Sequence, residues 1–428
     1  MFERSQVDTI ANRIVERDSP YIQVVVGPRQ TGKTTMISQA LARTGALHHF
    51  VSVDDAITPS TQWLETEWQQ ARNMAREAPV VLVVDEIQKV PHWSAAVKSL
   101  YDRDRRENVQ VKPILSGSSS LLLHKGFEDS LAGRYELIRS PHWGYAECRE
   151  AFGFSLDDYL FFGGYPGAAR LSSDVVRWAS YMRGAIIEPT ISQDVLALGE
   201  VRKPALMRAL FRLAVAYSAQ ELSYTKMLGQ LQDSGNTVTI AHYLDPLGKA
   251  GMVTSIPKFS DKEMTKRRSP PRLMVYDTSL MTAPSDKVRD LLMGDHALRG
   301  HLVEPAVGAR LLARAPEEGF EVMWWREGVR EVDFVLRHGS SLSAIEVKGG
   351  NEAGQNGMAA FLVKHPEAKR IVVGGAVSGA CSIEDFLLDR VPPVLVAARV
   401  GRWAAPNVNL HPNGLGRAQY QSVRVARI

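Results

Sequence analysis

An early glycine-bounded run has the residue types and spacing of a phosphate-binding loop. The segment VVVGPRQTGKTT fits the pattern G-x-x-x-x-G-K-[ST], with Gly27, Gly32, Lys33 and Thr34 at the fixed positions. Backbone N–H groups of such a loop point inward, and the N-terminus of the following helix adds positive potential. We expect Lys33 to contact the β and γ phosphates of a nucleoside triphosphate and the Thr34 hydroxyl to help hold Mg²⁺. The alternative is a glycine turn that binds nothing. The predicted nucleotide-binding residues are Gly27, Pro28, Arg29, Gln30, Thr31, Gly32, Lys33, Thr34 and Thr35.

Two acidic residues follow a second apolar run, VVLVVDEIQ, which begins at Val80. We expect this strand to be buried on both faces, as strands of parallel sheets are. It would deliver Asp85 and Glu86 at its carboxyl end, where ligands of open α/β sheets bind. Asp85 would orient Mg²⁺ through water, and Glu86 would polarise the water that attacks the γ phosphate. A solvated strand end is the alternative, but the phosphate loop upstream favours the catalytic interpretation.

Two further polar residues are candidates for the same chemistry. Ser116 follows the predicted strand 111–115 and is our candidate for sensing the γ phosphate. Its alternative role is in a serine-rich turn that caps a helix over 121–124. Arg134 would stabilise charge on the transferring phosphoryl group, in cis or from a neighbouring subunit. A surface salt bridge is the alternative for Arg134.

The elements that must position these residues follow from apolar periodicity. Val7, Ile10, Ile14 and Val15 have helical spacing and predict a helix within residues 1–20. Strands are predicted over 22–26, 49–53, 80–88 and 111–115, and helices over 33–43 and 61–77. Further along, the segment FFGGYP predicts a turn between two helical segments.

The middle of the chain shows the pattern helix, helix, turn, helix and strand pair over residues 205–259. This order suits a winged helix-turn-helix with a recognition helix over 237–250. Pro246 lies inside that segment and should kink or shorten the helix. A basic cluster follows that would neutralise DNA phosphates, or would belong to a solvated loop or a protein-contact module. Its members are Lys262, Lys266, Arg267, Arg268 and Arg272.

The last part of the chain carries a second acidic constellation. Strands are predicted over 322–326, 332–336, 344–348 and 371–373, and a helix begins near residue 301. Alternation along Glu346-Val347-Lys348 puts the two charged side chains on one face of their strand. A facing Asp333 would place two carboxylates and an ammonium in one pocket, suited to holding Mg²⁺ and activating water against a phosphodiester. The alternative is an exposed strand with alternating charges.

The loop GPRQTGKTT, the segments VVDEIQK, LSGSSS and SLAGR, and the later FFGGYP together resemble one family of bacterial and archaeal AAA+ type ATPases. The resemblance covers nearly the whole chain, and members of that family join the ATPase to a winged helix and a C-terminal domain related to restriction endonucleases. It implies the roles already given to Lys33, Thr34, Asp85 and Glu86, and it supports those of Ser116 and Arg134. The D…E-x-K arrangement resembles a restriction-endonuclease active centre. Glu304 stands where that family has a further helix acid.

Composition is compatible with this organisation. At 428 residues the chain is long enough for about three domains of ~150 residues. Hydrophobic content of 45% and charged content of 23% are typical of globular proteins. The formal net charge of +4 permits a nucleic-acid partner without requiring one. The longest apolar runs are too short to cross a bilayer, and the start MFERSQVDTI lacks an apolar signal segment, so we expect a cytoplasmic protein.

We therefore expect an α/β protein that begins with a P-loop NTPase parallel sheet over residues 1–150. A helical linker region over 151–204, a winged helix over 205–282 and a restriction-endonuclease-like domain over 283–428 would follow. The predicted function is Mg²⁺-dependent ATP hydrolysis coupled to the later domains and acting on DNA. An ATP-regulated DNA nuclease and a slow nucleotide-dependent switch that binds DNA or protein are the alternatives. A homo-oligomer is a candidate assembly, by analogy with ring-forming ATPases.

Overall fold

The computed structural model describes residues 2–17, 19–118, 130–196, 203–231, 236–260, 269–285, 289–349 and 356–394. Three predicted features lie outside the described residues. These are the helix over 121–124, the basic residues Lys262, Lys266, Arg267 and Arg268, and the chain beyond residue 394.

The first sheet contains five parallel strands in the order β2-β3-β4-β1-β5. Their bounds are β1 (Ile22–Gly27), β2 (His48–Ser52), β3 (Val80–Asp85), β4 (Val111–Ser118) and β5 (Tyr135–Arg139). Strand β3 is buried along its whole length, as its uninterrupted apolar run predicted. Because β4 lies between β1 and β3, the carboxyl ends of all three strands meet at one edge of the sheet.

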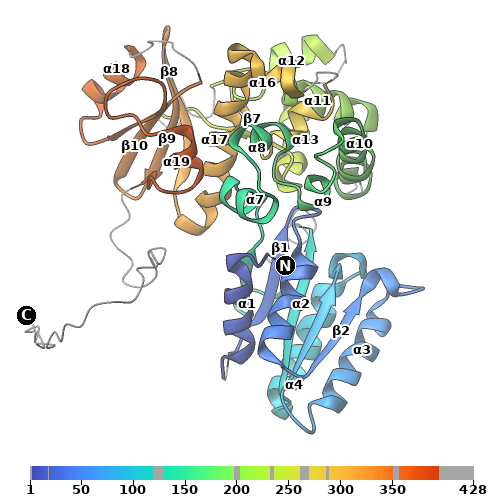
Figure 1. Ribbon diagram of the computed structural model, residues 1–428. Coiled ribbons are helices and arrows are strands. Elements are labelled where there is room, and N and C mark those ends of the chain that lie inside the picture. Colours follow the sequence, from blue (N-terminus) through green and yellow to red (C-terminus); the bar gives the residue numbers. More distant parts are fainter. Residues whose placement is uncertain are drawn as a thin grey trace, which may run out of the picture. The chain divides into compact units, whose positions relative to one another are not determined.

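Helices cover both faces of this sheet (Figure 1). On one face, α1 (Ser5–Val15) and α2 (Lys33–Thr44) pack on Val25 of β1. On the other, α3 (Thr61–Met74) and α4 (Trp93–Glu107) pack on Val24. Successive residues of β1 therefore enter different apolar clusters, which is the period-two alternation of a strand covered on both sides. Val15, predicted on the apolar face of the first helix, is instead 60% exposed at the helix's last position.

A run of helical segments follows the sheet. These are the α-helices α7 (Tyr145–Phe152), α8 (Leu156–Phe162), α9 (Pro166–Ala169) and α10 (Val175–Tyr181) and the π-helices η3 (Met182–Ile187) and η4 (Thr190–Val195). The FFGGYP turn lies between α8 and α9, as predicted. Gly163 is required there because a Cβ atom would lie 1.9 Å from Asp277 Oδ1.

Three helices and an antiparallel hairpin come next, namely α11 (Pro204–Ala216), α12 (Tyr224–Leu231), α13 (Thr237–Lys249), β6 (Val253–Ile256) and β7 (Arg272–Val275). An isolated bridge joins Glu221, between α11 and α12, to Arg272 of the hairpin. Pro246 does not end α13, which continues to Lys249. The proline lies in the last turn, where its missing N–H removes one backbone bond without stopping the helix.

The remaining elements are α15 (Ser279–Thr282), α16 (Arg289–Gly294), α17 (His296–Glu318), β8 (Glu321–Glu327), β9 (Arg330–His338), β10 (Ser341–Lys348), α18 (Asn356–Lys364), β11 (Lys369–Gly374) and α19 (Ile383–Leu387). Strands β11-β10-β9-β8 form a sheet in which only β10 and β11 are parallel. Phe334 and Ile345 share an apolar cluster with Val303 of α17, whereas Val335 packs with Phe361 of α18. Helices therefore cover both faces of this second sheet as well (Figure 1). Among the described helices, none has the length and apolar character needed to span a membrane.

Candidate functional site

The loop between β1 and α2 brings its backbone to the carboxyl edge of the first sheet. A Cβ atom on Gly27 would lie 2.1 Å from the Ser140 carbonyl oxygen, so only glycine fits there. Gly32 has a φ of 88°, a left-handed conformation that residues with side chains rarely adopt. Among the described residues, no side chain caps α2, which begins at Lys33. Its first backbone N–H groups are therefore available to an anion.

Lys33 is buried against the loop. Its Nζ donates to the carbonyl oxygens of Gly27 at 3.0 Å and Pro28 at 2.8 Å. Burial lowers the pKa of Lys33, and the nearby Glu86 and Asp85 carboxylates oppose that shift. Anionic phosphate oxygens would accept from this ammonium more strongly than the neutral carbonyl oxygens do. The side chain is thus positioned for a phosphate.

The Asp85 carboxylate accepts hydrogen bonds from α2, from β4 and from the residue directly after β3. Its Oδ2 accepts a hydrogen bond from Thr34 Oγ1 at 2.7 Å, while its Oδ1 accepts from the Ser116 hydroxyl and from the Glu86 backbone N–H at 3.1 Å. The carboxylate is only 6% exposed. A carboxylate and a hydroxyl oxygen are the donor types that Mg²⁺ prefers, so Thr34 and Asp85 fit the predicted metal.

Ser116 lies within β4, opposite Val25 of β1, rather than in a turn after the strand. It is fully buried, and its hydroxyl is directed to Asp85. In this arrangement Ser116 orients the Asp85 carboxylate. The helix that it would cap in the alternative interpretation lies outside the described residues.

Glu86 is the first residue after β3 and has a left-handed backbone, with a φ of 56°. Such conformations in residues other than glycine cluster at functional sites. Its Oε2 accepts a hydrogen bond from Gln88 Nε2 at 2.6 Å and lies 3.7 Å from Lys89 Nζ. The side chain is 25% exposed, so this carboxylate is more accessible to water than its neighbour Asp85.

The structure does not bring Arg134 to this site. Its guanidinium donates to Asp102 of α4 at 2.8 and 3.1 Å. The next residue, Tyr135, pairs with Ile22 at the start of β1, whereas the phosphate loop follows the end of that strand. At about 3.3 Å per residue, the two sites are roughly 16 Å apart along the sheet. This placement does not support a contribution of Arg134 to the triphosphate of its own chain.

Contacts from distant parts of the sequence hold the loop. The Thr31 carbonyl accepts hydrogen bonds from Trp143 Nε1 at 3.0 Å and from Arg4 Nη1 at 3.4 Å. Arg4 is 3% exposed and pairs with Glu147 at 2.6 Å. The sequence motif does not predict these contacts, because nothing in the local sequence around Arg4, Trp143 or Glu147 indicates that they lie against the loop.

The loop residue Arg29 makes a two-pronged ion pair with Asp194 of η4. Arg29 Nη2 donates to Asp194 Oδ1 at 2.7 Å, and Arg29 Nε donates to Oδ2. The Asp194 side chain is 3% exposed. Sequence reasoning also missed Asp194, which lies in a helical segment without a recognisable motif.

Two of the three predicted nuclease acids, Glu304 and Asp333, lie beside a buried arginine. Arg272 Nη1 lies 2.8 Å from Glu304 Oε1 and 3.6 Å from Asp333 Oδ1, and Nη2 pairs with Glu331. The Arg272 side chain is 4% exposed, so its predicted contact with DNA phosphates does not fit this structure. Burial, with the Asp333 carboxylate second, raises the pKa of Glu304 to about 8. The cluster therefore holds a protein cation where the sequence predicted Mg²⁺.

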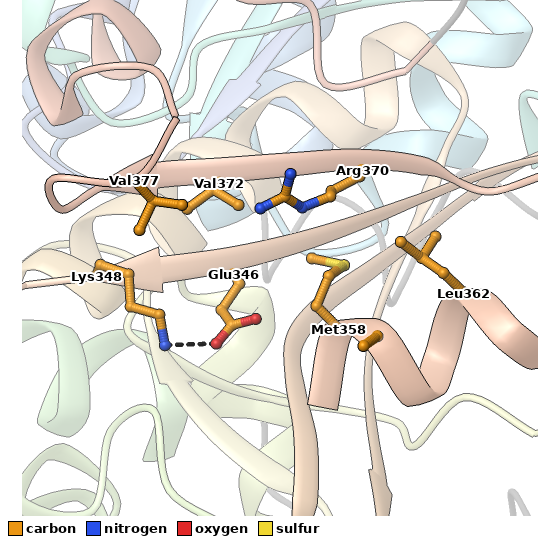
Figure 2. Close-up of a pocket in the computed structure, with 8 residues that line it drawn as sticks. Glu346, Lys348, Met358, Leu362, Arg370, Val372 and Val377 are labelled. Atoms are coloured by element: carbon orange, nitrogen blue, oxygen red, sulfur yellow. Dashed lines mark ion pairs between the residues drawn. The ribbon is translucent and has the colours of Figure 1, made fainter. Parts of the chain in front are cut away.

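Glu346 and Lys348 lie on one face of β10, as alternation predicted, and form an ion pair of 2.5 Å (Figure 2). They line a cavity of about 190 Å³ with Met358 and Leu362 of α18. Asp333 is not among the described residues that line it. Two residues of β9, Asp333 and Phe334, face Trp324 alone, and this bulge interrupts the regular alternation.

Two basic side chains lie among the acids of this second constellation. Among the described residues, no group of three or more His, Cys, Asp or Glu side chains is arranged to hold a metal ion. Arg272 contacts Glu304 on one side, and Lys348 pairs with Glu346 in the cavity. Asp333 Oδ2 accepts a hydrogen bond from the Val347 backbone N–H at 2.8 Å, so the predicted D…E-x-K residues lie on neighbouring strands, and their role in a nuclease stays a prediction.

The parallel five-stranded sheet and its loop fit the P-loop NTPase fold. Residues 19–148 match the family model described as an AAA domain. Residues 153–288 and 299–380 match two models described as domains of unknown function, DUF8612 and DUF4143.

No curated protein matches the chain. Among solved structures, AMPPCP-bound DnaA from Aquifex aeolicus is 13% identical, with a TM-score of 0.30, and the match covers 57% of this chain and 87% of that one. The Aeropyrum pernix Orc1 protein in complex with DNA is 13% identical, with a TM-score of 0.29 and coverage of 72% and 93%. Similarity at this level does not establish a shared fold.

Proposed function

We propose that this protein binds ATP with Mg²⁺ at the loop Gly27 to Thr34 and hydrolyses it. The observation that carries the proposal is the Asp85 carboxylate, which accepts a hydrogen bond from Thr34 at 2.7 Å while its other oxygen binds Ser116. The Thr34 hydroxyl at the start of α2 and the Asp85 carboxylate at the end of β3 thus lie together beside the glycine-bounded loop. The AAA domain match over residues 19–148 supports the same function.

Each residue has a task in this proposal. The loop N–H groups and Lys33 bind the phosphates, and Thr34 and Asp85 supply oxygen ligands for the metal. Mg²⁺, when bound, neutralises charge on the β and γ phosphates. Glu86, which is adjacent to Asp85 and more exposed, polarises the attacking water. Ser116 fixes the orientation of Asp85.

Two substitutions test this proposal. Lys33→Ala should abolish binding of a fluorescent ATP analogue, because it removes the ammonium that would donate to the β and γ phosphates. Glu86→Gln should keep binding and lower the rate of phosphate release by at least about a hundredfold, the usual size of a general-base contribution. Undiminished hydrolysis by Glu86→Gln would remove that residue from its role.

We assign Arg134 a catalytic role only in an active site that is shared with a second subunit. Arg134 lies too far from the phosphate loop of its own chain to contact a triphosphate bound there. Mixing Lys33→Ala protein with Arg134→Ala protein tests it, because hetero-oligomers would regain one complete site. Failure of such mixtures to recover hydrolysis would favour a structural pairing of Arg134 with Asp102.

The described part of the winged-helix region favours a protein partner over DNA. The solvent-facing side of α13 presents Val238, His242 and Asp245. Asp245 also pairs with Lys249 at 2.7 Å. A helix that reads DNA needs positive charge toward the phosphates, and this face has little. Salt-dependent binding to duplex DNA, measured by fluorescence anisotropy, would overturn this preference.

A further inference from the structure

We propose that Asp194 restrains the phosphate loop through Arg29, and that triphosphate competes with Asp194 for this guanidinium. Nucleotide binding would then release η4 from the loop. This inference rests on the proposed ATP site and adds a regulatory residue to it. Asp194 acts here as a positioning residue, because it reaches the site only through Arg29.

The ion pair has the geometry of a specific contact. Both Asp194 oxygens accept from the planar guanidinium, one at 2.7 Å. Among the described residues, Arg29 is the only hydrogen-bond donor to the Asp194 side chain. The hydrogen bond to Asp194 raises the pKa of Arg29, so the guanidinium stays charged. A buried carboxylate that loses its paired guanidinium is strongly destabilised.

A phosphate group competes for the same donors. Arg29 lies in the loop itself, two residues after Gly27 and four before Lys33. Phosphate oxygens accept the same two-pronged pattern from a guanidinium as a carboxylate does, and a triphosphate carries more negative charge. Asp194 also lies close enough to Lys33 for its charge to raise that lysine's pKa. Its negative charge therefore opposes a second anion at the loop.

The consequence is a reciprocal linkage. If the ion pair disfavours nucleotide, bound nucleotide must disfavour the ion pair by the same factor. Asp194 belongs to η4, a π-helical segment that contacts both α11 and α13. Such segments are frequent at functional positions, and a change at η4 would reach the helices on which it packs. The loop thereby communicates its occupancy to the middle of the chain.

The test measures affinity of the full-length chain for a fluorescent MgATP analogue. We expect Asp194→Asn to bind it about tenfold more tightly, within the usual range for coupled sites. Arg29→Gln should bind more weakly, and adding Asp194→Asn to Arg29→Gln should change little. Asp194→Glu, which keeps the charge, should resemble the wild type. Gln193→Ala, at an exposed neighbour on the same segment, is the matched control.

Hydrogen exchange supplies a second readout. Nucleotide should increase exchange in peptides covering residues 187–196 of the wild type, and Asp194→Asn should show that increase without nucleotide. Equal or weaker nucleotide binding by Asp194→Asn, with the wild type binding normally, would overturn the inference alone. Absence of binding by the wild type and by Asp194→Asn would overturn the proposed ATP site and this inference together.

Discussion

Replacement of Arg4 by alanine should weaken the whole region around the phosphate loop. The guanidinium donates to Glu147 through Nε at 2.6 Å and Nη2 at 3.1 Å. It also donates to Ser140 Oγ and the Pro141 carbonyl, each at 3.1 Å, and lies 5.4 Å from the centre of the Trp143 ring. One side chain therefore ties the start of the chain to the segment after β5.

The size of the effect follows from burial. Removing one partner of a buried ion pair costs about 3–5 kcal/mol, because the other charge remains without compensation. Glu147 is 21% exposed and water can reach it, so we expect the lower end, about 3 kcal/mol. The Thr31 carbonyl keeps its bond from Trp143. Nucleotide affinity should therefore fall only about fivefold, the worth of one hydrogen bond of about 1 kcal/mol.

Urea unfolding followed by hydrogen exchange of peptides from residues 22–36 would measure the loss of stability. Arg13→Ala is the matched control, because Arg13 pairs with Glu16 and Glu136 and these three side chains are 37%, 43% and 29% exposed. Each such exposed pair contributes about 1 kcal/mol or less. Arg4→Lys should fall between the two, since lysine keeps the charge without the forked geometry. Equal stability of Arg4→Ala and Arg13→Ala would refute this account of the buried pair.

Three further changes have defined outcomes. Gly27→Ala should lower the unfolding free energy by about 1–3 kcal/mol and abolish nucleotide binding, because its Cβ would meet a backbone oxygen at 2.1 Å. Ser116→Ala should slow ATP hydrolysis about tenfold with little change in nucleotide affinity, since Asp85 loses one donor worth about 1.5 kcal/mol. Burial raises the pKa of Glu304 from 4.5 to about 8, so its stabilising contribution is present below about pH 4.5 and is lost as pH rises through about 8. At about 1.4 kcal/mol per pKa unit the full shift corresponds to roughly 4–5 kcal/mol, which we discount to about 2 kcal/mol because the Glu304 side chain is 25% exposed. Between pH 5 and 9 the wild type should therefore lose this unfolding free energy while Glu304→Gln does not, and parallel pH profiles in urea unfolding would contradict this.

The sequence by itself determined the local elements of the nucleotide site. The pattern of Gly27, Gly32, Lys33 and Thr34 indicates a strand, a loop and a helix, because this spacing is characteristic of a phosphate-binding loop between a strand and a helix. The run before Asp85 predicted a strand covered on both faces, and β3 is buried throughout. These predictions depend on neighbours in the chain, and periodicity records such neighbours directly.

Only the tertiary structure decided which distant side chains meet. Strand order places Ser116 beside Asp85. Arg134 directly precedes β5, whose first residue pairs with the start of β1, so it lies at the end of the sheet away from the phosphate loop. Arg272 lies between Glu304 and Asp333, two of the acids predicted for the nuclease site. A charge pattern in the sequence does not reveal which counter-ion the fold brings to it, because ion pairs between remote segments depend on strand order and packing. The pairing of Arg29 with Asp194 depends on the fold for the same reason.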